Sequence, residues 1–247
     1  MWEPLIGPLA ADHRVLVPDL RGFGRSSVSR KGYRKHVLAA DILALLDAEQ
    51  IESATVIGHD WGGWVAWLLA LEHPQRVERF AALDIPRPGA HERSPGRILR
   101  QLLFGAYQYA IASPVLGRRL VGSPAAMRAF IRAGSGPDAE WTDAQLDLYI
   151  RQFGEPARAR ASVALYRSFL LEEVPSIARG KYTATELRVP GLAIMGGRSG
   201  ITRALGLPRP DPLLRVEVIE NAGHFLVDEQ PVRVLELIRG FLGERSG

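Results

Sequence analysis

The 247-residue sequence contains no cysteine, and this absence removes several kinds of site at once. It excludes a disulfide scaffold, a thiolate nucleophile and a cysteine-ligated zinc or iron–sulfur centre. Lysine is also scarce, because only Lys31, Lys35 and Lys181 stand among the 31 basic residues. The arginines are spread along the chain without a run of five, so the net charge of +4 does not indicate nucleic-acid binding.

Long apolar runs are missing as well. The sequence has no stretch of eighteen consecutive apolar residues, and its first residues lack the basic and apolar regions of a signal peptide. We therefore expect no membrane span and a cytoplasmic location. The hydrophobic fraction of 47% and the charged fraction of 23% are ordinary globular values. The length fits one large α/β domain, or a core domain with an inserted lid.

The order of the expected elements predicts an α/β fold. Apolar strand candidates alternate with helical segments at 36–49 and 64–74, which is typical of a parallel sheet with helices on both faces. Residues 94–178 contain several helical segments and no convincing strand. We therefore predict a core formed by residues 1–88 and 186–247, with an all-helical lid at 89–185. The strand candidates lie at 13–20, 54–58, 76–86, 189–197 and 215–224.

Two motifs carry candidate chemistry. Gly58-His59-Asp60-Trp61-Gly62-Gly63 lies between a predicted strand and a predicted helix, the setting in which G-x-S-x-G forms a nucleophile elbow. Asp60 occupies the central position, although an aspartate there could also cap the following helix. The second motif is Asn221-Ala222-Gly223-His224-Phe225. His224 follows the last predicted strand, where the active sites of open α/β sheets gather, and a structural histidine is the alternative.

These motifs, together with PDLRGFGRSS at 18–27, LDIP at 83–86 and NAGHFLVDEQP at 221–231, resemble α/β-hydrolases of the epoxide hydrolase and haloalkane dehalogenase group. The resemblance implies a mostly parallel α/β-hydrolase sheet with an inserted all-helical lid (cap). An aspartate nucleophile that attacked an ester would form a reactive anhydride. Attack by Asp60 on an sp³ carbon forms a stable ester instead, which a water activated by His224 then cleaves.

The third member of the catalytic triad is less obvious. The group usually places an acid after the strand that corresponds to 192–196, where this chain has Ser199. A second location is known after the strand that follows the helix of the nucleophile, and Asp84 stands there. The resemblance therefore assigns the triad acid to Asp84, with Asp211 and Asp228 as weaker candidates.

The resemblance also suggests leaving-group residues. Similar epoxide hydrolases use two lid tyrosines as proton donors, and the segment around Tyr149, followed by Leu-Tyr-Arg at 165–167, resembles the stretch that holds one of them. Tyr107 matches the other more loosely, and Tyr109 could replace it. Trp61 is expected to supply an oxyanion N–H. In dehalogenases the equivalent tryptophan binds the halide.

We therefore predict a hydrolase that opens small apolar epoxides with water, through a covalent ester on Asp60. A haloalkane dehalogenase with the same triad is the alternative. A further alternative is a catalytically impaired remnant of the hydrolase fold, or a binding protein. The sequence predicts no cofactor, because the histidines lack metal-ligand spacing and no phosphate loop or dinucleotide fingerprint occurs. The oligomeric state stays open.

The family resemblance implies further strands and a His-Gly-x-Pro loop before Trp2, and the sequence starts just after them. By resemblance, the missing strand would lie between 13–20 and 54–58. Unpaired buried backbone groups in such a sheet would each cost about 1–3 kcal/mol. We therefore expect a start codon further upstream and roughly 35–50 additional residues. The alternative is a genuine remnant with little catalysis.

Overall fold

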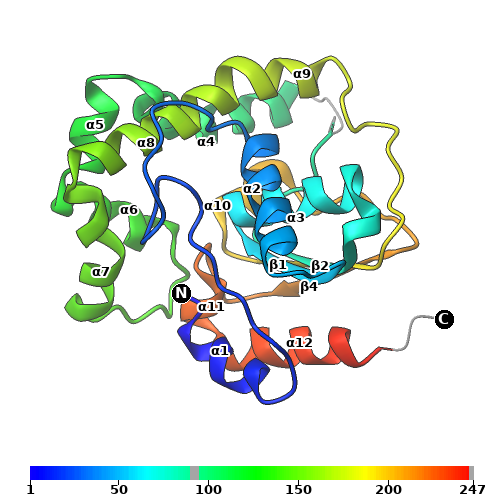
Figure 1. Ribbon diagram of the computed structural model, residues 1–247. Coiled ribbons are helices and arrows are strands. Elements are labelled where there is room, and N and C mark those ends of the chain that lie inside the picture. Colours follow the sequence, from blue (N-terminus) through cyan, green and yellow to red (C-terminus); the bar gives the residue numbers. More distant parts are fainter. Residues whose placement is uncertain (90–94, 245–247) are drawn as a thin grey trace.

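The computed structural model describes residues 1–89 and 95–244, and its centre is a parallel sheet (Figure 1). The strands β1 (Ala54–His59), β2 (Val77–Leu83), β3 (Gly191–Gly196) and β4 (Leu214–Ile219) are hydrogen-bonded in this spatial order. Each neighbouring pair is parallel. The carboxyl ends of parallel strands meet at one edge of a sheet, so the loops that follow these strands are brought together there.

The prediction of a strand at 13–20 was wrong. These residues have no regular secondary structure, and two of their apolar side chains, Leu16 and Val17, are 39% and 46% exposed. A strand is stable only when its backbone N–H and C=O groups pair with a neighbour. The segment pairs with no strand of the described chain and runs as an extended connection from α1 (Glu3–Ala10) toward α2 (Lys35–Ala48) (Figure 1).

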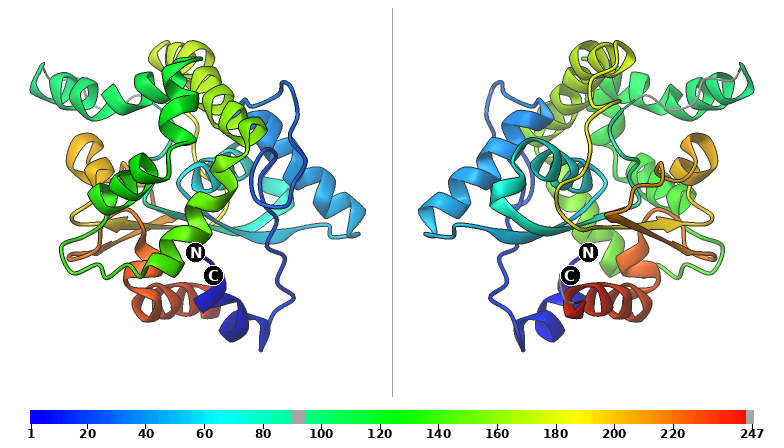
Figure 2. Two further views of the ribbon diagram at one scale, coloured as in Figure 1. Left: turned by 90° about the vertical axis from the view of Figure 1, so that its left-hand side faces the viewer. Right: turned by 90° about the vertical axis from the view of Figure 1, so that its right-hand side faces the viewer.

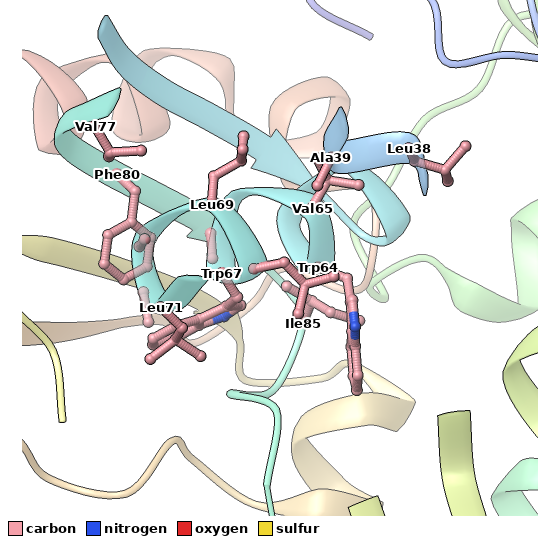
Figure 3. Packing of buried hydrophobic residues seen from close by; sticks show 14 of the residues in the cluster. Leu38, Ala39, Trp64, Val65, Trp67, Leu69, Leu71, Val77, Phe80 and Ile85 are labelled. Carbon is pink, nitrogen blue, oxygen red and sulfur yellow. The ribbon is translucent and has the colours of Figure 1, made fainter. Parts of the chain in front are cut away.

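The two faces of the sheet bury separate apolar clusters, because side chains alternate along a strand. Phe80 on β2 points to the face covered by α2 and α3 (Trp61–Glu72), where it contacts Trp67 at a ring-centroid distance of 4.6 Å (Figure 3). Leu83 and Ile194 point to the opposite face, which α1 and α12 (Pro231–Gly243) cover (Figure 2). Helices on both faces and the parallel strands confirm the predicted fold class.

A long run of helices lies between β2 and β3. Figure 1 shows most of these helices on the side of the sheet away from α1 and α12. They coincide with the segment expected to form an inserted lid, and the division of the chain into core and lid stays a prediction. The helices are α4 (Pro95–Ala112), α5 (Leu116–Val121), α6 (Pro124–Gly134), α7 (Asp143–Ile150), α8 (Pro156–Ser168) and α9 (Val174–Ala178).

Helix α8 does not run directly into α9. Helix α8 ends at Ser168, and the next turn, η3 (Phe169–Glu173), is π-helical. Single π-helical turns inside helices are frequent at functional sites. The remaining elements are two short 3₁₀ turns, η1 (Pro74–Arg76) and η2 (Arg151–Gly154), and the helices α10 (Gly200–Leu205) and α11 (Leu226–Glu229).

Candidate active site

Asp60 lies on a sharp turn directly after β1. Its backbone has φ +50° and ψ −119°, a conformation that side chains rarely adopt. The turn also needs glycine next to it, since a Cβ on Gly58 would lie 2.1 Å from the carbonyl oxygen of Gly62. The Asp60 side chain makes no capping hydrogen bond to α3, so the capping role considered for it is not observed. The strained turn instead presents the carboxylate at the edge of the sheet.

His224 lies opposite Asp60 and is oriented by Asp84. The Nδ1 atom of His224 is 2.7 Å from Oδ2 of Asp84, and its Nε2 is 3.9 Å from Oδ2 of Asp60. Asp84 is fully buried, and it accepts hydrogen bonds from the backbone N–H of Gly196 at 3.0 Å and from the hydroxyl of Ser199 at 2.5 Å. The structure therefore brings together the three residues predicted as a triad.

Ser199 has a role that the sequence did not reveal. It stands where the usual acid was expected, and its hydroxyl donates to Asp84. Thus Asp60, Asp84, Ser199 and His224 each follow a different strand of the sheet. The weaker candidates are engaged elsewhere: Asp211 pairs with Arg87 at 2.9 Å, and Asp228 accepts from the hydroxyl of Tyr149.

The triad loop of His224 is fixed to the helical segment. The backbone N–H of His224 donates to the carbonyl oxygen of Gly134 at 2.7 Å. The carboxylate of Glu229 accepts from the N–H groups of Gly136 and Gly223, at 2.8 and 2.7 Å. A Cβ on Gly223 would lie 2.3 Å from the backbone nitrogen of Gly136, so this close approach requires glycine.

Burial and neighbouring charges set the protonation of the site. Burial raises the pKa of Asp60 above its ordinary value, and the nearby Asp84 carboxylate adds to the rise, while His224 opposes it. Burial lowers the pKa of His224, but Asp84 and Asp60 outweigh this effect and the pKa is raised overall. An imidazole held between two carboxylates accepts a proton more readily, which suits a general base.

His59, which directly precedes Asp60, supports the loop of His224. Its Nε2 is 2.6 Å from the carbonyl oxygen of His224. Burial, followed by the charge of His224, lowers the pKa of His59 well below the ordinary value, so the ring is neutral. Because a carbonyl oxygen only accepts, Nε2 carries the proton of this neutral ring.

Two tyrosines of the helical segment lie near Asp60. Burial and the Asp60 charge raise the pKa of Tyr107 to about 12. The pKa of Tyr166 is raised further, first by burial and then by Tyr107 and Asp60. Tyr166 also packs edge-on against Trp61, with ring centroids 5.4 Å apart. Both hydroxyls are therefore protonated at neutral pH, and both lie near enough to the Asp60 carboxylate for its charge to raise their pKa values.

Tyr149 occupies a different place from the one predicted. Its hydroxyl donates to Asp228, and its ring packs against Trp141 and Phe225, at centroid distances of 5.7 and 6.1 Å. The resembling stretch contained two tyrosines, and the structure places Tyr166 rather than Tyr149 beside Trp61. Tyr109, considered as a substitute for Tyr107, is 57% exposed.

Trp61 presents a buried hydrogen-bond donor to the candidate site. Its indole Nε1 makes no hydrogen bond of normal geometry with the described residues, and the Tyr166 hydroxyl lies beside it. An unsatisfied buried donor normally costs stability, and such groups occur at sites that bind a ligand. Trp61 directly follows Asp60, and its indole lies against Tyr166, so this donor belongs to the candidate site.

Comparison with known proteins agrees with this geometry. The family model described as the alpha/beta hydrolase fold matches residues 1–231. The chain belongs to the alpha/beta hydrolase fold family. This membership confirms the predicted fold and supports an enzyme that is a hydrolase.

Individual relatives extend over most of the chain. It is 30% identical over 280 residues to epoxide hydrolase A of Mycobacterium tuberculosis, covering 98% of this chain and 85% of that protein. It is 29% identical over 248 residues to the soluble epoxide hydrolase of a Corynebacterium species, covering 95% and 82%. The crystal structure of Cfl2 from Burkholderia cenocepacia aligns with a TM-score of 0.78 at 27% identity, covering 97% and 82%.

Other kinds of site are not evident in the described part of this hydrolase. Within residues 1–89 and 95–244, no three His, Cys, Asp or Glu side chains come together as a metal site. In the same residues, no helix combines the length and the apolar character that crossing a membrane requires.

Proposed function

We propose that this hydrolase opens epoxides to diols through a covalent ester on Asp60. The observation that carries the proposal is the convergence of the Asp60–His224–Asp84 arrangement with the Tyr107 and Tyr166 hydroxyls. The relatives named epoxide hydrolases in Mycobacterium tuberculosis and Corynebacterium support the same reaction. The substrate is a small apolar epoxide, and water is the second reactant.

The first step forms the ester. One carboxylate oxygen of Asp60 attacks a ring carbon, and the bond between this carbon and the epoxide oxygen breaks. The oxygen leaves with the electron pair and takes a proton from Tyr107 or Tyr166. Both phenols keep their protons at neutral pH because their pKa values are raised, so they act as donors rather than as anions.

The second step cleaves the ester. His224 removes a proton from a water molecule, and the resulting hydroxide attacks the carbonyl carbon of the Asp60 ester. The backbone N–H of Trp61 lies close enough to the Asp60 carboxyl group to lower its pKa, and in this proposal it stabilises the developing oxyanion. The intermediate collapses as the bond to the alkoxide oxygen breaks, and the proton of the added hydroxyl group passes to that oxygen, which releases the diol and the Asp60 carboxylate. Asp84 holds the ring of His224 and stabilises its protonated form. Proton transfer from His224 to the tyrosinate, through water, completes the cycle.

The helices α4 to α9 act as a lid in this proposal. They supply Tyr107 and Tyr166, the two tyrosines whose pKa values the Asp60 charge raises. Trp61 packs against Tyr166 and Phe169, at centroid distances of 5.4 and 4.9 Å, so core and lid share an aromatic wall. Such a wall suits an apolar substrate and excludes water before the ester forms.

Haloalkane dehalogenation is the second candidate. The buried indole Nε1 of Trp61 favours it, because a departing halide ion needs N–H donors. The two tyrosines favour the epoxide instead, since a halide needs no proton to leave. Both reactions share the same ester on Asp60, so product analysis separates them: diol formation from an epoxide, or halide release from an alkyl halide.

The experiment that tests the proposal traps the ester. In a His224→Gln variant the ester forms but is not hydrolysed, so incubation with an apolar epoxide should add the mass of one epoxide to a peptide that contains Asp60. His13→Gln, at an exposed position, serves as the matched control and should turn over without an adduct. An Asp60→Asn variant should give neither adduct nor diol. A folded His224→Gln protein that gains no adduct from any epoxide would contradict the proposal.

A further inference from the structure

Lys35 is a buried lysine beside the candidate site. It is the first residue of α2, and its side chain is 0% exposed. Its Nζ donates to the carbonyl oxygen of Leu165 at 2.8 Å and lies 3.7 Å from Oε1 of Glu173. A fully buried lysine is rare and costs stability. The reaction steps described above do not use this ammonium group.

The same ammonium group lies over the ring of Trp61. Its Nζ is 4.2 Å from the indole centroid and 4.9 Å from that of Phe169. A cation in this position is attracted by the electron density of the ring face. It also draws that density toward itself, which makes the indole N–H a stronger donor. The donor in question is the Nε1 of Trp61, which is buried, lies beside the Tyr166 hydroxyl and makes no hydrogen bond of normal geometry with the residues described here.

We propose that Lys35 is a positioning residue. Its ammonium group lies against the ring face of Trp61, holds the indole in place and strengthens the indole N–H as a donor to an anion beside Asp60. This rests on the proposed function for the identity of the anion, which is the oxygen of an opening epoxide or a departing halide. Free bromide carries the same charge and accepts the same hydrogen bond. It therefore serves as a probe that requires no turnover.

Lys35 also binds the backbone next to Tyr166, the lid residue that packs against Trp61. The carbonyl oxygen of Leu165 directly precedes Tyr166 in the chain, and Lys35 binds it from the core. The hydroxyl of Ser168 lies 2.9 Å from the same oxygen and 2.8 Å from the carbonyl oxygen of Tyr33. These contacts lie where α8 gives way to the π-helical turn η3. One ammonium group thus contacts both the indole ring of Trp61 and the peptide group that precedes Tyr166.

Carboxylates on two elements stabilise the protonated form of Lys35. Burial lowers its pKa from 10.5 to about 8, while Glu173, Asp60 and Glu172 oppose this decrease in that order. Glu173 and Glu172 belong to η3, and Glu172 also pairs with Arg34. Because the ammonium form persists only below about pH 8, anion binding at Trp61 should weaken as the pH rises through this value.

Bromide binding tests the proposal directly. The excess line width of the ⁸¹Br NMR signal should report bound bromide in the wild-type protein at pH 7 and decrease with a midpoint near pH 8. In Lys35→Met, binding at pH 7 should be about tenfold weaker, and this pH step should be absent. Trp61→Phe should lose the binding as well. Lys31→Met, which replaces an exposed lysine, is the matched control and should match the wild type.

A second variant keeps the test decisive if Lys35→Met does not fold. Glu173→Gln retains the lysine and removes one of its counter-charges, so the midpoint for bromide binding should move to lower pH by roughly one unit. Bromide binding that is unchanged in both Lys35→Met and Trp61→Phe, or a midpoint that Glu173→Gln leaves in place, would overturn the proposal. A protein that binds bromide as expected but forms no ester on Asp60 would refute the proposed function alone.

Discussion

Replacing Lys35 by methionine should remove a pH-dependent penalty on folding. Methionine has a similar length and no charge, so the Lys35→Met variant keeps most of the packing against Trp61 and Phe169. The carbonyl oxygen of Leu165 keeps Ser168 as a partner. The two proteins therefore differ mainly in one titrating group, and the difference in their free energies of unfolding follows its protonation.

The expected change in the free-energy difference between the two proteins follows from the pKa of Lys35. It decreases from 10.5 in the unfolded chain to about 8 in the fold, and the side chain is fully buried, so solvent does not screen the effect. Between these pH values the unfolded state binds more protons than the folded state, so wild-type stability rises with pH relative to the variant. Each pKa unit corresponds to about 1.4 kcal/mol, so the difference should change by about 2.5 kcal/mol from pH 7 to pH 10.

Urea unfolding of both proteins, followed by far-UV circular dichroism, measures this difference. The tyrosines whose pKa values are raised are common to both chains, so their titration cancels in the comparison. Lys31→Met should show a constant difference from the wild type over the same range. A Lys35→Met difference that stays constant from pH 7 to pH 10 would refute the assignment of Lys35 as a buried ammonium group with a lowered pKa.

The catalytic residues yield further predictions. Asp84→Asn should lower kcat by about 10³–10⁴-fold, because the amide donates to Nδ1 of His224 and enforces the wrong tautomer; a folded variant with wild-type kcat would exclude Asp84 as the triad acid. Ser199→Ala removes one hydrogen bond to Asp84 and should lower kcat/KM by about tenfold, measured as the rate of diol formation from the same epoxide. Tyr166→Phe should slow epoxide opening by about 10²-fold. Tyr149→Phe should leave the rate near wild type, and equal losses in both tyrosine variants would contradict the roles assigned here.

The sheet was predictable because its strands are short apolar runs, each followed by a turn. The glycines around Asp60 and His224 mark loops at strand ends, and parallel strands bring such loops to one edge. The region at 13–20 has the same local pattern and yet is not a strand. Local apolarity does not determine whether a neighbouring backbone is present to pair with it, so this failure concerns a tertiary contact that the segment itself does not encode.

The candidate site was predictable where a residue type decides the chemistry. Asp60, His224 and Asp84 follow from motif order, whereas the choice between Tyr149 and Tyr166 depends on which face of a helix meets the sheet. Both tyrosines lie in one resembling stretch, and only the packing against Trp61 separates them. Lys35 has no sequence signal beyond the scarcity of lysine, since its environment is built by residues far away in the chain, such as Leu165 and Glu173.

The bonds between the loop of His224 and the end of α6 determine where the helical segment can move. Gly134 and Gly136 are attached to the same short loop that carries His224. A separation at this corner would displace His224 from Asp84, so the corner serves as a fixed pivot. Any movement of the helical segment that keeps His224 on Asp84 must therefore leave this corner in place. The amide hydrogen of His224, which is bonded to Gly134, records whether the pivot holds during turnover.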